Sequence, residues 1–427
     1  MSKAYDSMSK DELENELKVV QKKYDEYKAL GLKLDMSRGK PAPAQIDLSL
    51  PMMDVLNSSS DYMSIVDTRN YGIADGIPEA KKLIADILEV DPSEVIVCGN
   101  SSLNIMFDVV SKAMNKGIMG ETPWGKQSKV KFLCPVPGYD RHFAILQYFG
   151  IEMINVPMKE DGPDMDMVEE YVNNDSEVKG IWCVPKYANP TGISYSDEVV
   201  KRFAALKPAA KDFRIFWDNA YCIHDFYEDN QDKILPILSE CKKQGNDDLV
   251  YMFCSTSKVT FPGAGIAALA TSEANVKDYL SQLKWQTIGF DKINMLRHAR
   301  FFGDVNGVKK HMMKHAALIR PKFEIVLKTL EKELGGLGIG KWTNPIGGYF
   351  ISFDSLDGCA KEIVKTAKEA GVVMTGAGAT YPYGKDPKDS NIRIAPTYPT
   401  EEELQKACDL FAVCVKLVSL KKLLAKL

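Results

Sequence analysis

The chain has 427 residues, more than usually fold around a single hydrophobic core, and this length predicts two domains. Hydrophobic residues make up 45% of the chain and charged residues 26%, shares that are typical of a globular protein. The formal net charge of −4 offers no basic surface, so we expect neither nucleic acid nor a membrane among its partners.

The N-terminal sequence and the cysteines bear on the location of the protein. MSKAYDSMSKDELENELK is too polar for a secretory signal, and no apolar run reaches the ~18 residues of a membrane span. The nine cysteines lie mostly within apolar runs and include no CxxC pair, which is typical of reduced, packed thiols. We therefore expect a cytoplasmic protein with neither a disulfide frame nor a metal site.

The N-terminal part combines one helical pattern with irregular segments. Apolar residues recur at helical spacing in residues 10–30, which predicts an amphipathic arm. Residues 34–43, which contain Arg38 and Gly39, and residues 67–76 are rich in glycine and polar residues and predict loops.

Strand and helix patterns alternate through the middle of the chain. Short apolar runs predict strands at residues 94–98, 130–134, 152–156, 180–185, 213–217, 249–254 and 266–270. Helices are predicted at residues 77–88, 103–114, 140–149 and 196–206. This alternation predicts an α/β fold with a mostly parallel sheet that is covered by helices on both faces.

The C-terminal part is mainly helical. Helices are predicted at residues 276–287, 291–302, 305–334, 358–370 and 400–424, with strands at 349–353 and 392–395. We expect an N-terminal arm with part of a small domain in residues 1–60, a large domain in residues 61–315 and a small α+β domain in residues 316–427. The last boundary falls inside the long predicted helix.

A polar turn follows the predicted strand at residues 94–98 and leads into a helix. It reads Gly99-Asn100-Ser101-Ser102. Free backbone N–H groups and the helix dipole point at one spot there, and two hydroxyls add donors, which predicts an anion site. The alternative, that Asn100 or Ser101 only caps the helix, is equally consistent with the local sequence.

Two charged residues also stand at the ends of predicted strands. Asp218 closes the run FRIFWD, where an open parallel sheet carries its site residues, although an N-cap or a surface aspartate is the alternative. Lys258 follows the apolar run at residues 249–254. A lysine buried there tends to be neutral and nucleophilic, whereas the alternative is a surface lysine in a Ser/Thr loop.

Four predicted strands end in polar motifs, which follow one another along the chain as GNSS (99–102), NPTG (189–192), DNAY (218–221) and STSK (255–258). Together with NIRIAP around Arg393, the chain resembles the class I, fold-type I pyridoxal-phosphate aminotransferases over roughly residues 35–420. The runs LDMSRGKP, PVPGYDRHF and TFPGAG resemble the divergent bacterial aspartate aminotransferase subgroup. The resemblance implies a large domain with a mostly parallel seven-stranded sheet, a smaller α+β domain and pyridoxal 5′-phosphate as cofactor.

The resemblance also implies roles for single residues. Lys258 would bind the cofactor covalently and move the proton at the substrate Cα, and Asp218 would pair with the pyridine nitrogen. Asn189 and Tyr221 would donate hydrogen bonds to the 3-oxygen of the ring, with Tyr221 counted as catalytic, and Tyr139 would cover the ring. The other cofactor-binding residues would be Asn100, Ser101, Ser102, Ser255, Ser257 and, across the interface of a homodimer with shared active sites, Tyr71.

For the substrate, the resemblance implies that Arg393 binds the α-carboxylate through a bidentate fork while the backbone of Gly39 lies beside it. Asn189 would contact the substrate as well as the cofactor. The expected reaction transfers an amino group from aspartate to 2-oxoglutarate. Aspartate needs a second cation for its side-chain carboxylate, and three remain open for that role: Arg38, Lys292 and Arg297.

Two positions depart from the family pattern. The family usually has a phosphate-binding arginine eight residues after the lysine, where this chain has Ile266. Either another cation replaces it, or hydroxyls and helix N–H groups hold the phosphate alone; the open candidates are Lys40, Lys186, Lys292 and Arg297. The aromatic residue over the ring is Tyr139, unless the alignment places Val136 there.

The sequence context argues against two other functions and leaves a third group open. Residues 263–268 fit the G-x-G-x-x-A fingerprint of nicotinamide enzymes, but Pro262 precedes them and a strand-like run follows. A ligand-sensing transcription regulator would need a basic N-terminal domain, and the segment before LDMSRGKP is short and acidic. A lyase, or an aminotransferase with aromatic, alanine or broad specificity, remains open.

Overall fold

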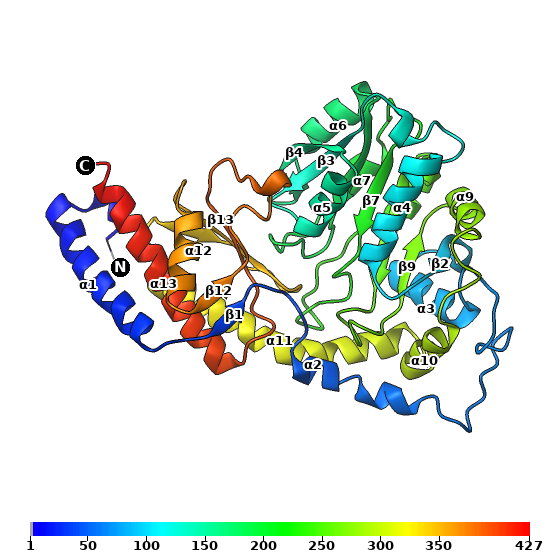
Figure 1. Cartoon of the computed structure of the whole chain (residues 1–427), viewed down its shortest axis with the longest axis horizontal. Helices are drawn as coiled ribbons and strands as arrows, with labels where there is room; N and C mark the ends of the chain where they lie inside the picture. The colour runs from blue at the N-terminus through cyan, green and yellow to red at the C-terminus, as the bar shows by residue number, and fades with distance from the viewer. Residues whose placement is uncertain (1–2) are drawn as a thin grey trace.

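The computed structural model describes residues 3–427, so the first two residues of the predicted N-terminal arm lie outside it. The chain forms two lobes that are joined by one long helix, α11 (Val305–Leu334), which runs beneath both in Figure 1. The larger lobe contains the middle of the chain. The smaller lobe contains both ends, with α1 (Lys10–Ala29) packed beside α13 (Glu401–Leu424).

The larger lobe is built on an eight-stranded sheet with the order β2-β9-β8-β7-β6-β3-β4-β5. The strands are β2 (Val95–Val97), β3 (Lys131–Val136), β4 (Glu152–Lys159), β5 (Gly162–Pro163), β6 (Val178–Cys183), β7 (Arg214–Asp218), β8 (Val250–Ser255) and β9 (Ala267–Ala270). Neighbours are parallel from β8 to β4, and β9 is antiparallel to both of its neighbours. The predicted fold is confirmed, with the two-residue β5 added as an antiparallel edge to the seven expected strands.

Helices cover both faces of this sheet because its central strands are apolar on both sides. In β7, Ile215 and Trp217 pack into one core while Phe216 packs into the other. The helices of the first core are α3 (Pro78–Leu88), α6 (Met165–Asn174), α7 (Asp197–Ala204), α8 (Ile237–Lys243) and α10 (Lys292–Phe302). Those of the second are α4 (Ser102–Lys116), α5 (Asp140–Tyr148) and α9 (Glu273–Leu283). The sequence did not predict α6 and α8.

The smaller lobe combines two small sheets with helices. A parallel pair joins β1 (Leu34–Met36) to β12 (Val372–Met374), and a three-stranded antiparallel sheet has the order β10 (Gly340–Trp342), β11 (Ile351–Ser355), β13 (Asn391–Ile394). The helix α12 (Ala360–Glu369) and the ends of the chain complete its core. The sequence missed β1, β10 and β12 because three residues are too few to show a period.

The helix α11 belongs to both cores. Val308 and Met312 pack near α3 and α10, whereas Ile319 and the apolar residues after it pack in the core of the smaller lobe. The helix therefore changes core between Met312 and Ile319, and the domain boundary at residues 315 and 316 stays a prediction. The short helix α2 (Pro43–Asp47), from the N-terminal part of the chain, lies against α11.

Two features of other protein classes are not seen in residues 3–427. None of the helices in this range is both long and apolar enough to cross a bilayer. The same range contains no group of three or more His, Cys, Asp and Glu side chains arranged to hold a metal ion.

Candidate active site

A cavity of about 160 Å³ opens where the parallel strands of the large sheet end. Nine of the predicted site residues line it: Ser101, Ser102, Tyr139, Asn189, Asp218, Tyr221, Ser255, Ser257 and Lys258. They come from the segments that follow β2, β3, β6, β7 and β8, so residues far apart in the sequence meet because parallel strands end at the same edge.

Asp218, the last residue of β7, is buried in the wall of this cavity. Nε2 of His142 donates a hydrogen bond to its Oδ2 at 3.0 Å, while Oδ1 is buried and has no partner in the part of the chain that the structure describes. Because an unpaired buried carboxylate oxygen is costly, this atom fits a donor that a bound group supplies. The protonated pyridine nitrogen of pyridoxal phosphate is such a donor.

His142 is a residue of this site that the sequence analysis missed. It lies in the first turn of α5, is buried, and stacks on Trp182 with ring centroids 4.3 Å apart and planes 10° apart. The stacking holds the ring so that its Nε2 faces Asp218. The one available signal was its place in PVPGYDRHF, one helical turn after the predicted ring-covering Tyr139.

Lys258 lies in the turn that follows β8 and is half-buried, with its side chain in the wall of the cavity. Burial lowers the pKa of its amine, and the negative charge of Asp218 partly opposes this effect. Its Nζ lies 4.8 Å from the ring centroid of Tyr221 and 5.9 Å from that of Tyr349, a second residue that the sequence did not single out. The surface alternative for Lys258 is therefore wrong, since the structure places the amine inside the cavity.

Hydroxyl and helix N–H groups gather at one end of the cavity. Ser255 donates to Ser257 at 3.1 Å between Oγ atoms, and Ser257 donates to the carbonyl of Asn100 at 3.3 Å. Ser101 is the N-cap of α4 but makes no capping hydrogen bond with its side chain, so its hydroxyl is left for a ligand. The amide of Asn100 instead donates to the carbonyl of Gly263 at 3.4 Å.

The position of the family's phosphate-binding arginine is apolar in this chain. Ile266 is buried in the core below this turn. Lys186 pairs with Asp225 at 2.7 Å, and Lys40 lies 3.8 Å from the ring centroid of Tyr398. Together with Lys292 and Arg297, these lysines lie outside the lining of the cavity. The geometry favours a phosphate held by hydroxyls and the N-terminus of α4.

Arg393 approaches from β13 of the smaller lobe and is buried. Its Nη1 donates to Asp140 Oδ1 at 3.0 Å and to Asn189 Oδ1 at 3.3 Å, and its Nη2 donates to Thr375 Oγ1 at 3.2 Å. The guanidinium carbon lies 4.8 Å from the ring centroid of Phe350. The sequence analysis named neither Asp140 nor Thr375.

Two further predicted residues lie close to these groups. A Cβ atom added to Gly39 would lie 2.3 Å from Cζ of Phe350, the ring beneath Arg393, so this close approach requires glycine. Tyr139 lines the cavity and meets His142 edge-on, with ring centroids 4.9 Å apart, whereas Val136 lies in the apolar core. This favours Tyr139 over Val136 as the residue that covers the ring.

Besides Asn100, Gly39 and Arg393, four predicted residues are absent from the lining of this cavity in their own chain: Arg38, Tyr71, Lys292 and Arg297. Tyr71 is 80% exposed, Arg38 is exposed, and Lys292 is buried at the start of α10. Arg297 donates from Nη2 to Asn294 at 2.6 Å. Their roles stay predictions for a site completed by a second chain.

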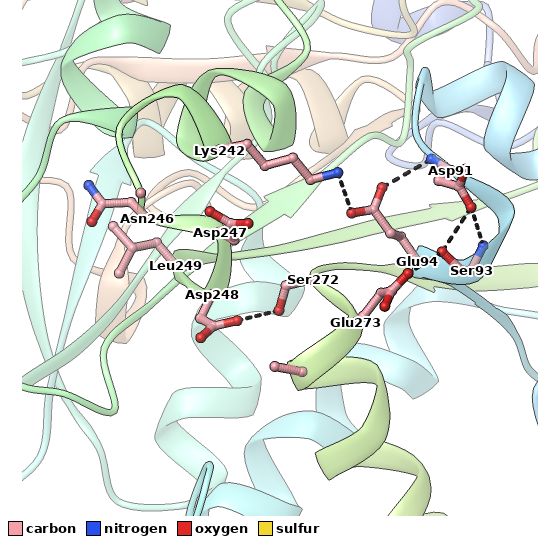
Figure 2. Close-up of a pocket in the computed structure, with 12 residues that line it drawn as sticks. Asp91, Ser93, Glu94, Lys242, Asn246, Asp247, Asp248, Leu249, Ser272 and Glu273 are labelled. Carbon is pink, nitrogen blue, oxygen red and sulfur yellow. Dashed lines mark hydrogen bonds and ion pairs between the residues drawn. The ribbon is translucent and has the colours of Figure 1, made fainter.

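Figure 2 shows a larger hollow at the other edge of the sheet, where β2 and β8 begin. None of the predicted site residues lines it. Two of its carboxylates have protein partners, since Glu94 pairs with Lys242 at 2.5 Å and Asp248 accepts a hydrogen bond from Ser272. Size alone therefore does not mark the candidate active site.

Comparison with known proteins agrees with this geometry. The family model described as aspartate aminotransferase matches residues 8–426. The chain belongs to this family. An aspartate aminotransferase of Corynebacterium glutamicum is 46% identical over 403 residues, 94% of this chain and 93% of that protein.

Solved structures of aminotransferases share the whole fold. The crystal structure of an aspartate transaminase from C. glutamicum has a TM-score of 0.96 at 43% identity, covering 99% of this chain and 100% of that one. An α-aminoadipate aminotransferase of Thermus thermophilus, solved with N-(5′-phosphopyridoxyl)-L-leucine, has a TM-score of 0.73 at 19% identity, covering 92% and 94%. Family membership confirms the predicted family, fold class and pyridoxal-phosphate cofactor, and makes the chain an aminotransferase.

Proposed function

We propose that the protein transfers the amino group of L-aspartate to 2-oxoglutarate, giving oxaloacetate and glutamate. The observation that carries the proposal is the pairing, in one cavity, of the buried amine of Lys258 with the unpartnered Oδ1 of Asp218. The donor is the finer part of the proposal, and the name of the 46% identical C. glutamicum relative supports it.

The residues of the chain would act on the bound groups as follows. Pyridoxal phosphate supplies an electron sink that stabilises negative charge at the substrate Cα. Asp218 would hold a proton on the pyridine nitrogen through Oδ1. Lys258, kept towards its neutral form by burial, would take the proton from Cα and return it. Asn189 and Tyr221 would fix the tilt of the ring.

Substrate binding falls to the smaller lobe. Arg393 would bind the α-carboxylate, with Gly39 beside it. The side-chain carboxylate of aspartate would be bound by Arg38, Lys292 or Arg297, in the same chain or from the partner subunit. The alternative within the family is another amino donor, or a lyase reaction on the same scaffold.

We also infer a homodimer with shared active sites, in which Tyr71 reaches the phosphate bound by the partner. Large apolar side chains are exposed in two segments, residues 63–65 and 285–288: Met63 (52%), Ile65 (69%), Trp285 (84%) and Ile288 (64%). A second copy of the chain would bury them. A cytoplasmic location belongs to the same proposal, and the nine free cysteines support it.

A donor panel with 2-oxoglutarate tests the reaction. The amino-acid half-reaction is followed by loss of the absorbance of the lysine-bound cofactor, and products are identified by chromatography. We expect the highest kcat/KM for aspartate. A higher kcat/KM for an aromatic amino acid or alanine would show that aspartate is not the preferred donor. Elimination products without amino-group transfer would show that the enzyme is a lyase.

A further inference from the structure

The strongest clue beyond the proposed function is the carboxylate that already occupies Arg393. Oδ1 of Asp140 accepts a hydrogen bond from Nη1 of Arg393 at 3.0 Å. The two residues come from different lobes, since Asp140 begins α5 beside the large sheet while Arg393 lies in β13 of the smaller lobe. The ion pair therefore bridges the lobes beside the cavity.

The arginine is the fixed member of this pair. Its side chain is 7% exposed and its guanidinium lies over Phe350. Thr375 donates its hydroxyl to the carbonyl of Ser37 at 2.6 Å, which leaves an oxygen lone pair to accept from Nη2 of Arg393. The guanidinium is thus held in one orientation without any help from Asp140.

Asp140 is the movable member. Its side chain is 37% exposed, so water can replace the arginine as its partner. It also occupies the first turn of α5, where the helix dipole and free N–H groups stabilise a carboxylate. Both features lower the cost of releasing Asp140 from Arg393.

An incoming carboxylate needs the atoms that Asp140 occupies. A bidentate pair requires two parallel N–H donors, and Nη1 is shared by Asp140 and Asn189. Nε of Arg393 is buried and has no partner in the described residues. The guanidinium therefore keeps an N–H group, on Nε, that the carboxylate of Asp140 at Nη1 does not pair with.

We propose that Asp140 is a displaceable internal ligand of Arg393, which pairs with the arginine in the empty enzyme and competes with the substrate α-carboxylate. This inference rests on the proposed function, in which Arg393 binds that carboxylate. The buried cation is never left unpaired, since Asp140 keeps it neutralised until a substrate replaces it. The affinity for every α-carboxylate is lowered by the cost of this displacement.

Succinate, a dicarboxylate without an amino group, is the probe, and its dissociation constant is measured by calorimetry on the cofactor-loaded enzyme. Asp140→Asn keeps the shape and removes the charge, so we expect succinate to bind about five to ten times more tightly. KM should fall by a similar factor for both substrates, a change that a merely structural role would not produce. The control is Arg141→Gln, which alters the exposed neighbour, and it should leave the constant within twofold.

Unchanged or weaker binding in Asp140→Asn would overturn the inference. Asp140→Ser, which also removes the charge, tests the same point if the asparagine variant folds poorly by circular dichroism. Arg393→Gln separates the two proposals. If it leaves succinate binding unchanged, the carboxylate site of the proposed function fails; if it abolishes binding while the Asp140 variants show no gain, only the displacement fails.

Discussion

His142 pairs with only one oxygen of the Asp218 carboxylate: Nε2 of His142 lies 3.0 Å from Oδ2, whereas Oδ1 is buried with no partner among residues 3–427. The arrangement leaves Oδ1 for a ligand while Oδ2 is hydrogen-bonded to the protein. His142 is in turn held by its stacking on Trp182, so the orientation of the carboxylate depends on residues from three elements, β7, α5 and β6.

Replacing His142 by phenylalanine tests this dependence. The variant retains an aromatic ring beside Trp182 but removes the donor to Oδ2, which leaves that oxygen unpaired and loosens the orientation of the carboxylate towards the ring nitrogen. We expect kcat to fall about tenfold, the factor for one hydrogen bond of about 1.4 kcal/mol. His142→Gln, which restores a donor, should recover part of kcat; equal losses in both variants would contradict the assigned role.

Lys258→Ala should separate cofactor binding from catalysis. Asp218, Asn189 and the hydroxyls remain, so the variant should still bind pyridoxal phosphate, as equilibrium dialysis would show. Without the amine at Cα, transamination should fall by roughly 10³-fold or more. A variant that retains a tenth of the wild-type rate would show that another group moves the proton.

The lowered pKa of Lys258 predicts a pH-dependent stability of the cofactor-free protein. The unfolded chain binds more protons than the folded one between the lowered pKa and the usual value of 10.5, so stability rises with pH across that window. Lys258→Met removes the buried amine, and we expect it to raise the free energy of unfolding at pH 7 by more than at pH 10. Urea unfolding at the two pH values measures the difference, with Lys211→Met, at an exposed lysine, as the control. A gain that does not shrink as pH rises would contradict the buried amine.

Arg38→Ala and Arg297→Ala test the binding of the side-chain carboxylate. Loss of one charge-assisted hydrogen bond should lower kcat/KM for aspartate by about 10- to 100-fold in at least one variant. The values for alanine and phenylalanine as donors should change less than about threefold, because neither has a second carboxylate. Equal losses with all three donors would remove the assignment of these arginines.

Gly39→Ala places a methyl group against the ring below Arg393. Since the Cβ would lie 2.3 Å from Cζ of Phe350, the ring must shift, at a cost of about 1–3 kcal/mol in the free energy of unfolding. KM for both substrates should rise several-fold. Gly376→Ala is the matched control, because it lies next to Thr375 and its added Cβ meets no atom within 4 Å. The idea fails if both variants raise KM equally.

The sequence by itself determined seven strands of the large lobe, its helices other than α6 and α8, and the residues at the strand ends. Each of these features has a local signature, because a buried strand is an apolar run in the sequence. Parallel strands end at one edge of a sheet, so the sequence alone predicts that Asp218 and Lys258 lie close together. The predicted helix at residues 305–334 has the bounds of α11 for the same reason, since its pattern extends over thirty residues.

Only the tertiary structure decided which partner each of these residues has. The pairs His142–Asp218, Asp140–Arg393 and Tyr349–Lys258 join segments 76, 253 and about 90 residues apart, and no period within a segment records such a contact. The same holds for β1 and β12, which pair across most of the chain. A short-range pattern reports what a segment buries, whereas the choice of neighbour is made by the packing of the two lobes around α11.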